Sequence, residues 1–279
     1  MRYIVAVSGG IDSVVLLDLM SRTEKDLVVA HFDHGIREDS ASDARFVEAL
    51  ADRYKLQFVC RREKLGANAS EELARQRRYD FLREVAADFD GVVVTAHHRD
   101  DIIETVVMNL RRGSRWRGLA GMSDARVVRP MNSWTKQRIY EYATRQKLEW
   151  CEDETNQSDI YQRNVLRRQI NCELDEYQKI GVYEAWRKQR KLRVEIEQAL
   201  ERFDREMSNR YFLTMIDDNV AQELIYYYIL RHYDVSLLGS QLERTLIAIK
   251  TGKSGSHWQI GGGIVMKLTL KNVIIDRVD

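Results

Sequence analysis

The sequence has few cysteines and a single proline among its 279 residues. Its three cysteines, Cys60, Cys151 and Cys172, lie far apart and form no CxxC pair. This spacing argues against a disulfide framework, a zinc ribbon and an iron-sulfur cluster held by cysteines, and it fits a reducing compartment.

The chain also lacks a signal-peptide pattern at its start and any uncharged apolar run of about 18 residues. We therefore expect a cytoplasmic protein with no membrane partner. The net charge is +1, so neither sign dominates. A polyanionic partner would have to bind local basic patches rather than respond to the overall charge.

Short β-prone runs alternate with helical patterns over the first half of the chain. The expected strands are Tyr3–Val7, Leu27–Phe32, Gln57–Arg61 and Val92–Ala96, and the expected helices between them are Asp12–Met20, Asp43–Tyr54 and Glu71–Ala87. This alternation predicts an α/β fold with a doubly wound parallel sheet. In such folds the ligand site lies at the carboxyl ends of the strands.

The second half has a different pattern. A long charged helical segment, Glu173–Met207, is followed by two helical patterns, Asn219–Tyr233 and Ser240–Lys250, and by a glycine-punctuated β-prone stretch, Ser256–Asp276. We predict an N-terminal α/β catalytic domain at residues 1–172, a helical connector at 173–209 and a small α+β domain at 210–279.

The hexapeptide SGGIDS, residues 8–13, joins the first expected strand to the first expected helix. Such a joint surrounds a small concave space with backbone N–H groups and favours phosphate. SGGIDS matches neither GxxxxGK[ST] nor GxGxxG. Asp12 would repel phosphate unless a cation lay between them, which points to Mg²⁺. The alternative is an ordinary strand-helix turn capped by Ser8 or Asp12.

The segment AHHRDDIIET, residues 96–105, follows the last expected strand and enters a helix. Asp101 and Glu104 are three residues apart, so they share a helical face that can bind a cation or an ammonium group. A charged helix start favoured by the helix dipole is the alternative. His97 and His98 have no third partner at ligand spacing, so they indicate a zinc site only weakly.

SGGIDS directly after the first strand resembles the PP-motif of the N-type ATP pyrophosphatases, which cleave ATP to AMP and pyrophosphate while activating a carbonyl oxygen. Further motifs occur in the order and spacing of the tRNA(Ile)-lysidine synthetase family: HFDHGIRE (31–38), EELARQRRYDFL (71–82), AHHRDDIIET (96–105), RRGSRWRGLAGM (111–122), RPMNSWTKQRIYEYA (129–143) and WCEDETNQSDIYQRNVLR (150–167). The resemblance covers about residues 1–170. The stretch GKSGSHWQI is similar to that family's carboxyl-terminal module, which implies that the small domain at 210–279 binds tRNA.

This resemblance implies that ATP and Mg²⁺ bind at the strand ends. It implies that Asp12 and Asp101 hold Mg²⁺ and that Arg75 and Arg78 complete the catalytic set. The residues that would bind ATP are Ala6, Ser8, Gly9, Gly10, Ile11, Asp12, Ser13, His31 and Phe32. For Arg75 and Arg78, a surface ion-pair ladder on their helix is the alternative.

Residues 111–138 form a basic segment with eight Arg or Lys residues and one acid, Asp124. Trp116 and Trp134 lie among them, and arginine beside tryptophan suits phosphate contact and base stacking. We therefore expect Arg112 and Arg117 to contact tRNA, with a solvated arginine-rich surface as the alternative.

Arg163 and Arg167 are four residues apart on a predicted helix. No acid lies near them between Tyr161 and Ile170, which favours an anionic ligand over an ion pair. We therefore expect Arg163 and Arg167 to bind a substrate, and tRNA is the anionic substrate.

The resemblance implies an ATP-dependent ligase. Its substrates would be free L-lysine and the wobble cytidine of tRNA(Ile), joined at C2 through an adenylated cytidine to give lysidine, AMP and pyrophosphate. Glu104 would orient the lysine ammonium, and a homodimer is possible.

Three other functions are alternatives to this ligase. They are a tRNA sulfurtransferase, which the missing CxxC pair disfavours, an amidating synthetase, and a non-catalytic RNA-binding protein.

Overall fold

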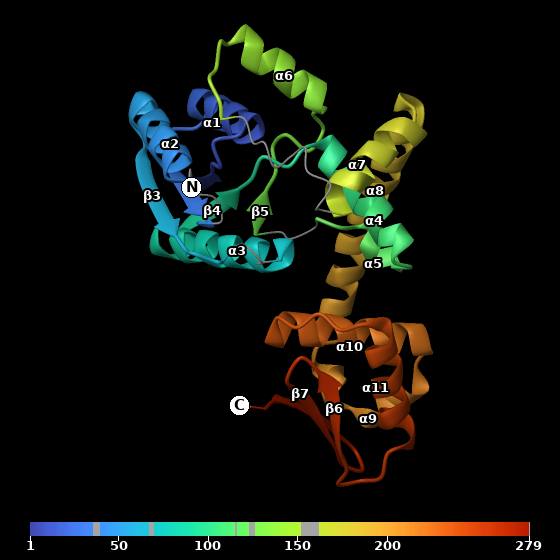
Figure 1. The fold of residues 1–279 in the computed structure, drawn as a ribbon. Coiled ribbons are helices and arrows are strands. Elements are labelled where there is room, and N and C mark those ends of the chain that lie inside the picture. Colours follow the sequence, from blue (N-terminus) through green and yellow to red (C-terminus); the bar gives the residue numbers. More distant parts are fainter. Residues whose placement is uncertain (36–39, 67–69, 115, 123–125, 152–161, 279) are drawn as a thin grey trace. The chain divides into compact units, whose positions relative to one another are not determined.

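The computed structural model describes residues 1–35, 40–66, 70–114, 116–122, 126–151 and 162–278 (Figure 1). The chain divides into two compact units, Met1–Arg190 and Lys191–Asp279. The division falls inside the segment expected to be a connector, and the three-part domain assignment stays a prediction. No helix in the described ranges has the length and apolar character needed to cross a membrane.

The first unit is built on a five-stranded parallel sheet. Its strands are β1 (Arg2–Ala6), β2 (Leu27–Asp33), β3 (Gln57–Arg62), β4 (Gly91–Val94) and β5 (Val127–Val128), in the order β3-β2-β1-β4-β5. Because β1 lies at the centre, Ile4 pairs with Val28 on one side and with Val93 on the other. The predicted doubly wound parallel sheet is confirmed.

Helices cover both faces of this sheet (Figure 1). The described helices of the first unit are α1 (Ile11–Thr23), α2 (Ser40–Tyr54), α3 (Glu71–Asp88), α4 (Arg99–Arg111), α5 (Trp116–Leu119), α6 (Lys136–Arg145), α7 (Gln162–Glu173) and α8 (Glu176–Glu201), the last of which continues into the second unit. One core cluster packs α1, α2 and α6 on the sheet, and a second packs α3 on the opposite face. Two further clusters join α4 to α7 and α8 through Ile102, Ile103 and Trp186.

The second unit is a small α+β module, as predicted. It contains the 3-10 helix η2 (Arg205–Ser208), helices α9 (Arg210–Met215), α10 (Asp218–Tyr233) and α11 (Gly239–Thr251), and strands β6 (His257–Gly261), β7 (Ile264–Leu268) and β8 (Val273–Arg277). The strands form an antiparallel sheet with β7 in the middle. Leu200 and Met207 belong to the core of this unit.

Candidate functional site

The loop SGGIDS connects β1 to α1 and is closed by its own hydroxyl groups. The Ser13 hydroxyl donates to the Gly10 carbonyl at 2.8 Å and accepts from the Ser8 N–H at 3.1 Å. Because the N-cap of α1 is Gly10, no side chain caps this helix. The N–H groups of Ser13 and Val14 donate to the Gly10 carbonyl at 3.0 Å and 3.1 Å, so those of Ile11 and Asp12 are the ones at the start of α1 that can face a ligand above the loop.

Gly9 allows the loop to turn. Its φ of +94° lies in the region that favours glycine, and a Cβ there would lie 3.4 Å from the Sγ of Cys151. The Cys151 N–H also donates to the Gly9 carbonyl at 2.9 Å. The segment that follows α6 therefore packs against the SGGIDS loop through Cys151.

Asp12 is the charged side chain of this loop, and it has a cationic partner. Lys136 Nζ lies 2.6 Å from Asp12 Oδ1, and the two side chains are 50% and 33% exposed. Lys136 is the first residue of α6, and its N–H donates to Asp100 Oδ2 at 2.9 Å. The sequence does not distinguish Lys136 from the other seven basic residues of its segment. Its proximity to Asp12 arises only in the folded chain.

The strand-end motifs meet at His98. Its Nε2 lies 3.4 Å from Asp101 Oδ2 and 3.9 Å from Asp12 Oδ1, and its side chain is buried. Asp101 also accepts the N–H of His98 at 3.0 Å, which completes a capping box at the start of α4. Asp12 and Asp101 are therefore neighbours, although they come from different strand ends.

This pair of carboxylates is chemically suited to Mg²⁺. Among the described residues, no group of three or more His, Cys, Asp or Glu side chains is arranged to hold a metal ion by itself. Mg²⁺ bound beside phosphates needs only one or two protein carboxylates, because phosphate and water oxygens complete its octahedron. Asp12 and Asp101 provide that number.

Glu104 lies one turn along α4 and is buried, and it binds Arg167 of α7. Arg167 Nε donates to Oε1 at 2.5 Å and Nη2 to Oε2 at 3.2 Å, while Nη2 lies 3.6 Å from Asp101 Oδ1. The expectation that the charge of Arg167 lacks an acidic partner is wrong. The partner is 63 residues away in sequence, where a local search for acids could not find it.

Arg75 and Arg78 lie on α3 on the opposite face of the sheet from α1. Their guanidinium carbons lie 4.9 Å and 5.8 Å from the centre of the Tyr79 ring. Burial lowers the pKa of His97, Asp101 partly opposes this, and the positive charges of Arg75, Arg129 and Arg78 lower the pKa further. These arginines therefore act electrostatically on the same strand-end region as Asp101.

The remaining residues of the predicted ATP set lie at the ends of β1 and β2. His31 is buried, and its Nδ1 lies 2.8 Å from the Val7 carbonyl, so this nitrogen carries the proton. Phe32 packs against the rings of His34 and Phe81. Ala6, at the end of β1, is half-buried beside them.

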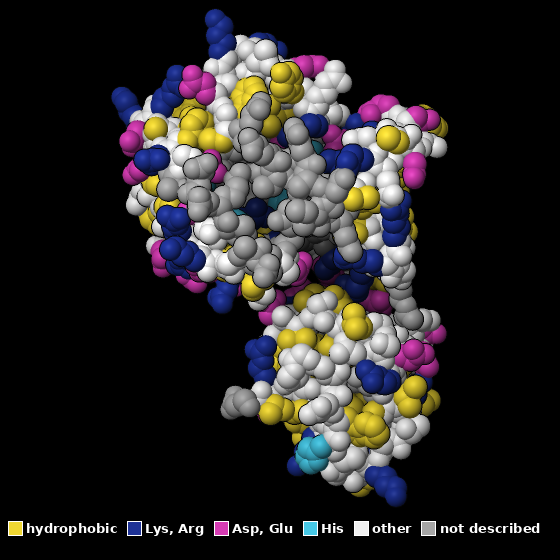
Figure 2. All heavy atoms as spheres, in the orientation of Figure 1, with side chains coloured by type: hydrophobic (Ala, Val, Ile, Leu, Met, Phe, Trp, Pro, Cys, Tyr) yellow, Lys and Arg dark blue, Asp and Glu magenta, His cyan; other side chains and the backbone are white. Residues whose placement is uncertain are grey.

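The expected tRNA contacts are placed only in part. Arg112 is exposed at the end of α4, and the guanidinium of Arg117 lies 4.6 Å from the Trp116 ring centre. The side chain of Arg163 lies outside the described residues. Figure 2 shows Lys and Arg side chains at several places around the first unit, including the side that α4, α7 and α8 form in Figure 1.

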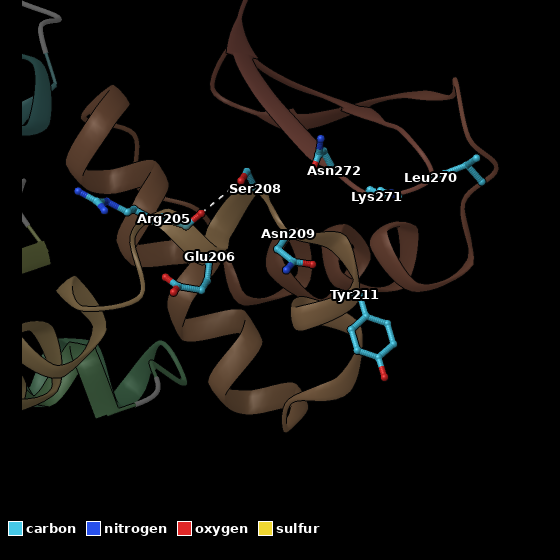
Figure 3. Close-up of a pocket in the computed structure, with 8 residues that line it drawn as sticks. All are labelled: Arg205, Glu206, Ser208, Asn209, Tyr211, Leu270, Lys271 and Asn272. Atoms are coloured by element: carbon cyan, nitrogen blue, oxygen red, sulfur yellow. Dashed lines mark hydrogen bonds between the residues drawn. The ribbon is translucent and has the colours of Figure 1, made fainter.

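A cleft of about 720 Å³ lies in the second unit, between the η2–α9 segment and the β7–β8 turn (Figure 3). Arg205 and Leu270 stand at its two ends, and Tyr211 projects from the start of α9. Tyr211 is 71% exposed and Leu270 is 84% exposed. Within the described part of the chain, neither Arg205 nor Lys271 forms an ion pair, so both charges are available to an anion.

Comparisons with known proteins identify the family of the first unit. The family model of the PP-loop domain matches residues 1–174. The tRNA(Ile)-lysidine synthase of Haemophilus ducreyi is 39% identical over 174 residues, which cover 60% of this chain and 40% of the relative. That of Enterococcus faecalis is 39% identical over 181 residues, which cover 60% of this chain and 39% of the relative. The chain therefore spans about 40% of the length of these relatives.

A solved structure supports the fold alone. The U34-tRNA thiolase NcsA from Methanococcus maripaludis, with its [4Fe-4S] cluster, superposes with a TM-score of 0.58 at 16% sequence identity. The match covers 68% of this chain and 72% of that one. The resemblance expected from the motifs is confirmed, and because the family model matches more than half of its residues, the chain belongs to the PP-loop domain family.

Proposed function

We propose that the protein is an ATP-dependent ligase that converts the wobble cytidine of tRNA(Ile), in a CAU anticodon, to lysidine. The observation that carries this proposal is the meeting of Asp12, Asp101 and Glu104 at one edge of the parallel sheet. The names of the curated relatives contain tRNA(Ile) and lysidine, which support this choice of tRNA and product. Membership of the PP-loop family, which uses ATP, supports ATP as the activating substrate.

ATP would bind with its phosphates above SGGIDS and its adenine near Ala6, His31 and Phe32. Mg²⁺ held by Asp12 and Asp101 would neutralise charge on the departing pyrophosphate. The N–H groups at the start of α1 would contribute to the same stabilisation without moving, because the loop is already closed by Ser8 and Ser13.

The reaction has two displacements. The O2 atom of the cytidine attacks the α-phosphorus of ATP, a new O–P bond forms, and pyrophosphate leaves. The amine of lysine, after loss of a proton, attacks C2 of the adenylated cytidine, and AMP leaves with the O2 atom. No protein nucleophile is needed, and Arg75 and Arg78 are proposed to stabilise the negative charge of the α-phosphate.

The Glu104–Arg167 pair is proposed as the lysine site. A free amino acid carries both ammonium and carboxylate groups, so a neighbouring carboxylate and guanidinium can bind its two charges. Glu104 and Asp101 would take ammonium hydrogen bonds, and Arg167 would bind the carboxylate. Because Glu104 is buried against Arg167, lysine binding requires that the pair open or share its hydrogen bonds.

The tRNA is proposed to contact both units. Arg112 and Arg117 lie on the arginine-rich segment of the first unit, and the cleft of the second unit offers Lys271 and the exposed ring of Tyr211. Phosphate contacts and base stacking are the interactions by which unpaired RNA is usually bound. A cytoplasmic location follows from this substrate.

The proposal is tested by ATP–pyrophosphate exchange in the presence and absence of tRNA. Exchange that requires the CAU-anticodon tRNA(Ile) and needs no lysine is expected, because adenylation precedes lysine attack. Exchange that proceeds without any tRNA would indicate a synthetase acting on a free metabolite. Sulfur transfer is not proposed, because the three cysteines form no CxxC pair and lie on separate segments.

A further inference from the structure

SGGIDS has the position of a phosphate loop but no lysine. In Walker A loops a lysine within the motif reaches the β- and γ-phosphates. Here the first residue of α6 brings a lysine to the loop, since Lys136 Nζ lies 2.6 Å from Asp12. We propose that Lys136 is the phosphate-binding lysine of this site, and that its ammonium moves from Asp12 to the β- and γ-phosphates when ATP binds.

The backbone of Lys136 is fixed relative to the strand ends. Its N–H donates to Asp100 Oδ2 at 2.9 Å, and the N–H of Arg99 donates to the Trp134 carbonyl at 2.8 Å. Two hydrogen bonds therefore tie the start of α6 to the start of α4. The position from which the lysine side chain extends is set before any ligand binds.

The side chain itself is free to change partners. Lys136 is half exposed and Asp12 is one-third exposed, so the observed pair forms without a large desolvation cost to either side chain. A lysine ammonium on a four-carbon stem can rotate among acceptors that lie a few ångströms apart. When a divalent cation neutralises Asp12, the polyphosphate becomes the stronger partner for Lys136.

Among the described residues, Arg167 also lies close to the carboxylates of this site, but it is already paired. Arg167 makes two hydrogen bonds to Glu104 and lies 3.6 Å from Asp101. It belongs to the proposed lysine site rather than to the phosphate loop. Lys136 is thus the basic side chain that the fold places directly on Asp12.

This proposal rests on the proposed function, in which the protein uses ATP. It predicts which ligands bind more weakly when Lys136 is replaced. Binding of ATP, AMP and pyrophosphate to the full chain would be measured by calorimetry, with and without Mg²⁺ and without tRNA. Lys136→Met should raise the Kd of ATP and of pyrophosphate at least tenfold and leave the Kd of AMP within twofold. Lys25→Met is the matched control, because Lys25 is exposed beyond the far end of α1.

A double-mutant cycle separates phosphate binding from a role confined to holding Asp12. In an Asp12→Asn background, Lys136→Met should still weaken ATP binding at least fivefold. A loss of this effect in that background, or equal weakening of AMP and ATP, would overturn the proposal. If Lys136→Met proves unstable in thermal unfolding, Lys136→Gln provides the same measurement with a polar side chain.

The result is distinguishable from failure of the proposed function. If the wild-type protein binds ATP but modifies no tRNA, the proposed ligase function is contradicted, and the Kd values still decide whether Lys136 binds phosphate. If the wild-type protein binds neither ATP nor pyrophosphate, the proposed role of Lys136 is overturned as well.

Discussion

Lys136 Nζ and Asp12 Oδ1 lie 2.6 Å apart although 124 residues separate them in sequence. Asp12 is in the first turn of α1, and Lys136 is the first residue of α6. Both helices begin at the same edge of the sheet, so two helix N-termini and two opposite charges meet there. This arrangement concentrates groups that bind anions beside a carboxylate that binds cations.

Glu104→Gln tests the proposed lysine site. The amide keeps the shape of the side chain but removes the charge that would bind an ammonium group, so the KM of lysine should rise at least tenfold. The KM of ATP should stay within twofold. Steady-state kinetics with each substrate varied in turn measure this, and Glu48→Gln on α2 is the control. A raised KM of ATP with an unchanged KM of lysine would assign Glu104 to the nucleotide instead.

Asp18 is expected to stabilise the first unit. This buried carboxylate accepts hydrogen bonds from Arg22 at 2.9 Å, Tyr54 at 2.7 Å and Tyr142 at 2.6 Å, and so joins α1, α2 and α6. Asp18→Asn should lower the free energy of unfolding by about 2–4 kcal/mol at pH 7. Urea unfolding followed by circular dichroism would measure it, with Asp52→Asn as the exposed control.

The contribution of Asp18 should depend on pH. Burial alone would raise its pKa, but the hydrogen bonds from Arg22, Tyr142 and Tyr54 lower the pKa overall from 3.8. A folded-state pKa below the unfolded value means that the stabilisation is present above about pH 4 and is lost as the pH falls through the folded value. The difference between wild type and Asp18→Asn should therefore shrink below pH 4. A difference that grows in acid would contradict this sign.

Arg112 and Arg117 are predicted to bind phosphates of the tRNA. Replacing both by alanine should weaken tRNA binding and reduce the slope of log K against log salt by about 0.7–0.9 for each phosphate that an arginine no longer neutralises. Filter binding at several salt concentrations gives the slope, and Arg53→Ala on α2 controls for the loss of one positive charge. An unchanged slope would mean that these arginines form only a solvated surface.

The cleft of the second unit is predicted to bind unpaired nucleotides of the tRNA. Tyr211→Ala should raise the Kd of tRNA five- to thirtyfold by removing a stacking surface worth about 1–2 kcal/mol, with little change in the salt slope. Lys271→Ala should instead lower that slope. The Kd of ATP should not change in either variant. Val220→Ala, which removes an exposed apolar side chain outside the cleft, is the control, and an equal effect of all three would refute the assignment.

The sheet could be predicted from sequence because the residues of β1, β2 and β4 are buried or half-buried throughout. Strand β2 is buried at every position, and it begins with the uninterrupted apolar run 27–30. Strand β5 was not predicted, since Val127–Val128 is too short to produce a pattern. The small antiparallel sheet was expected only as a β-prone stretch, because glycines at 261–263 obscure the strand ends.

The site was predictable where its residues follow a strand directly. Ser8–Ser13 and Asp101 are recognisable because strand ends of a parallel sheet share one edge. The partners of these residues were not predictable, since Lys136 approaches from 124 residues away and Arg167 approaches Glu104 from 63 residues away. The search for acids near Arg167 in sequence gave a wrong expectation, because ion pairs form between residues that are close in space and not only between neighbours in the chain.

The most direct measurement of the central claim is lysine incorporation into tRNA. Purified protein would be incubated with ATP, Mg²⁺, radiolabelled L-lysine and a panel of tRNA transcripts. The account predicts that label enters only tRNA(Ile) with a CAU anticodon, that incorporation requires ATP, and that Asp12→Asn abolishes it while leaving the fold intact. Absence of label from this tRNA in the presence of ATP, or equal labelling of other tRNAs, would contradict the account.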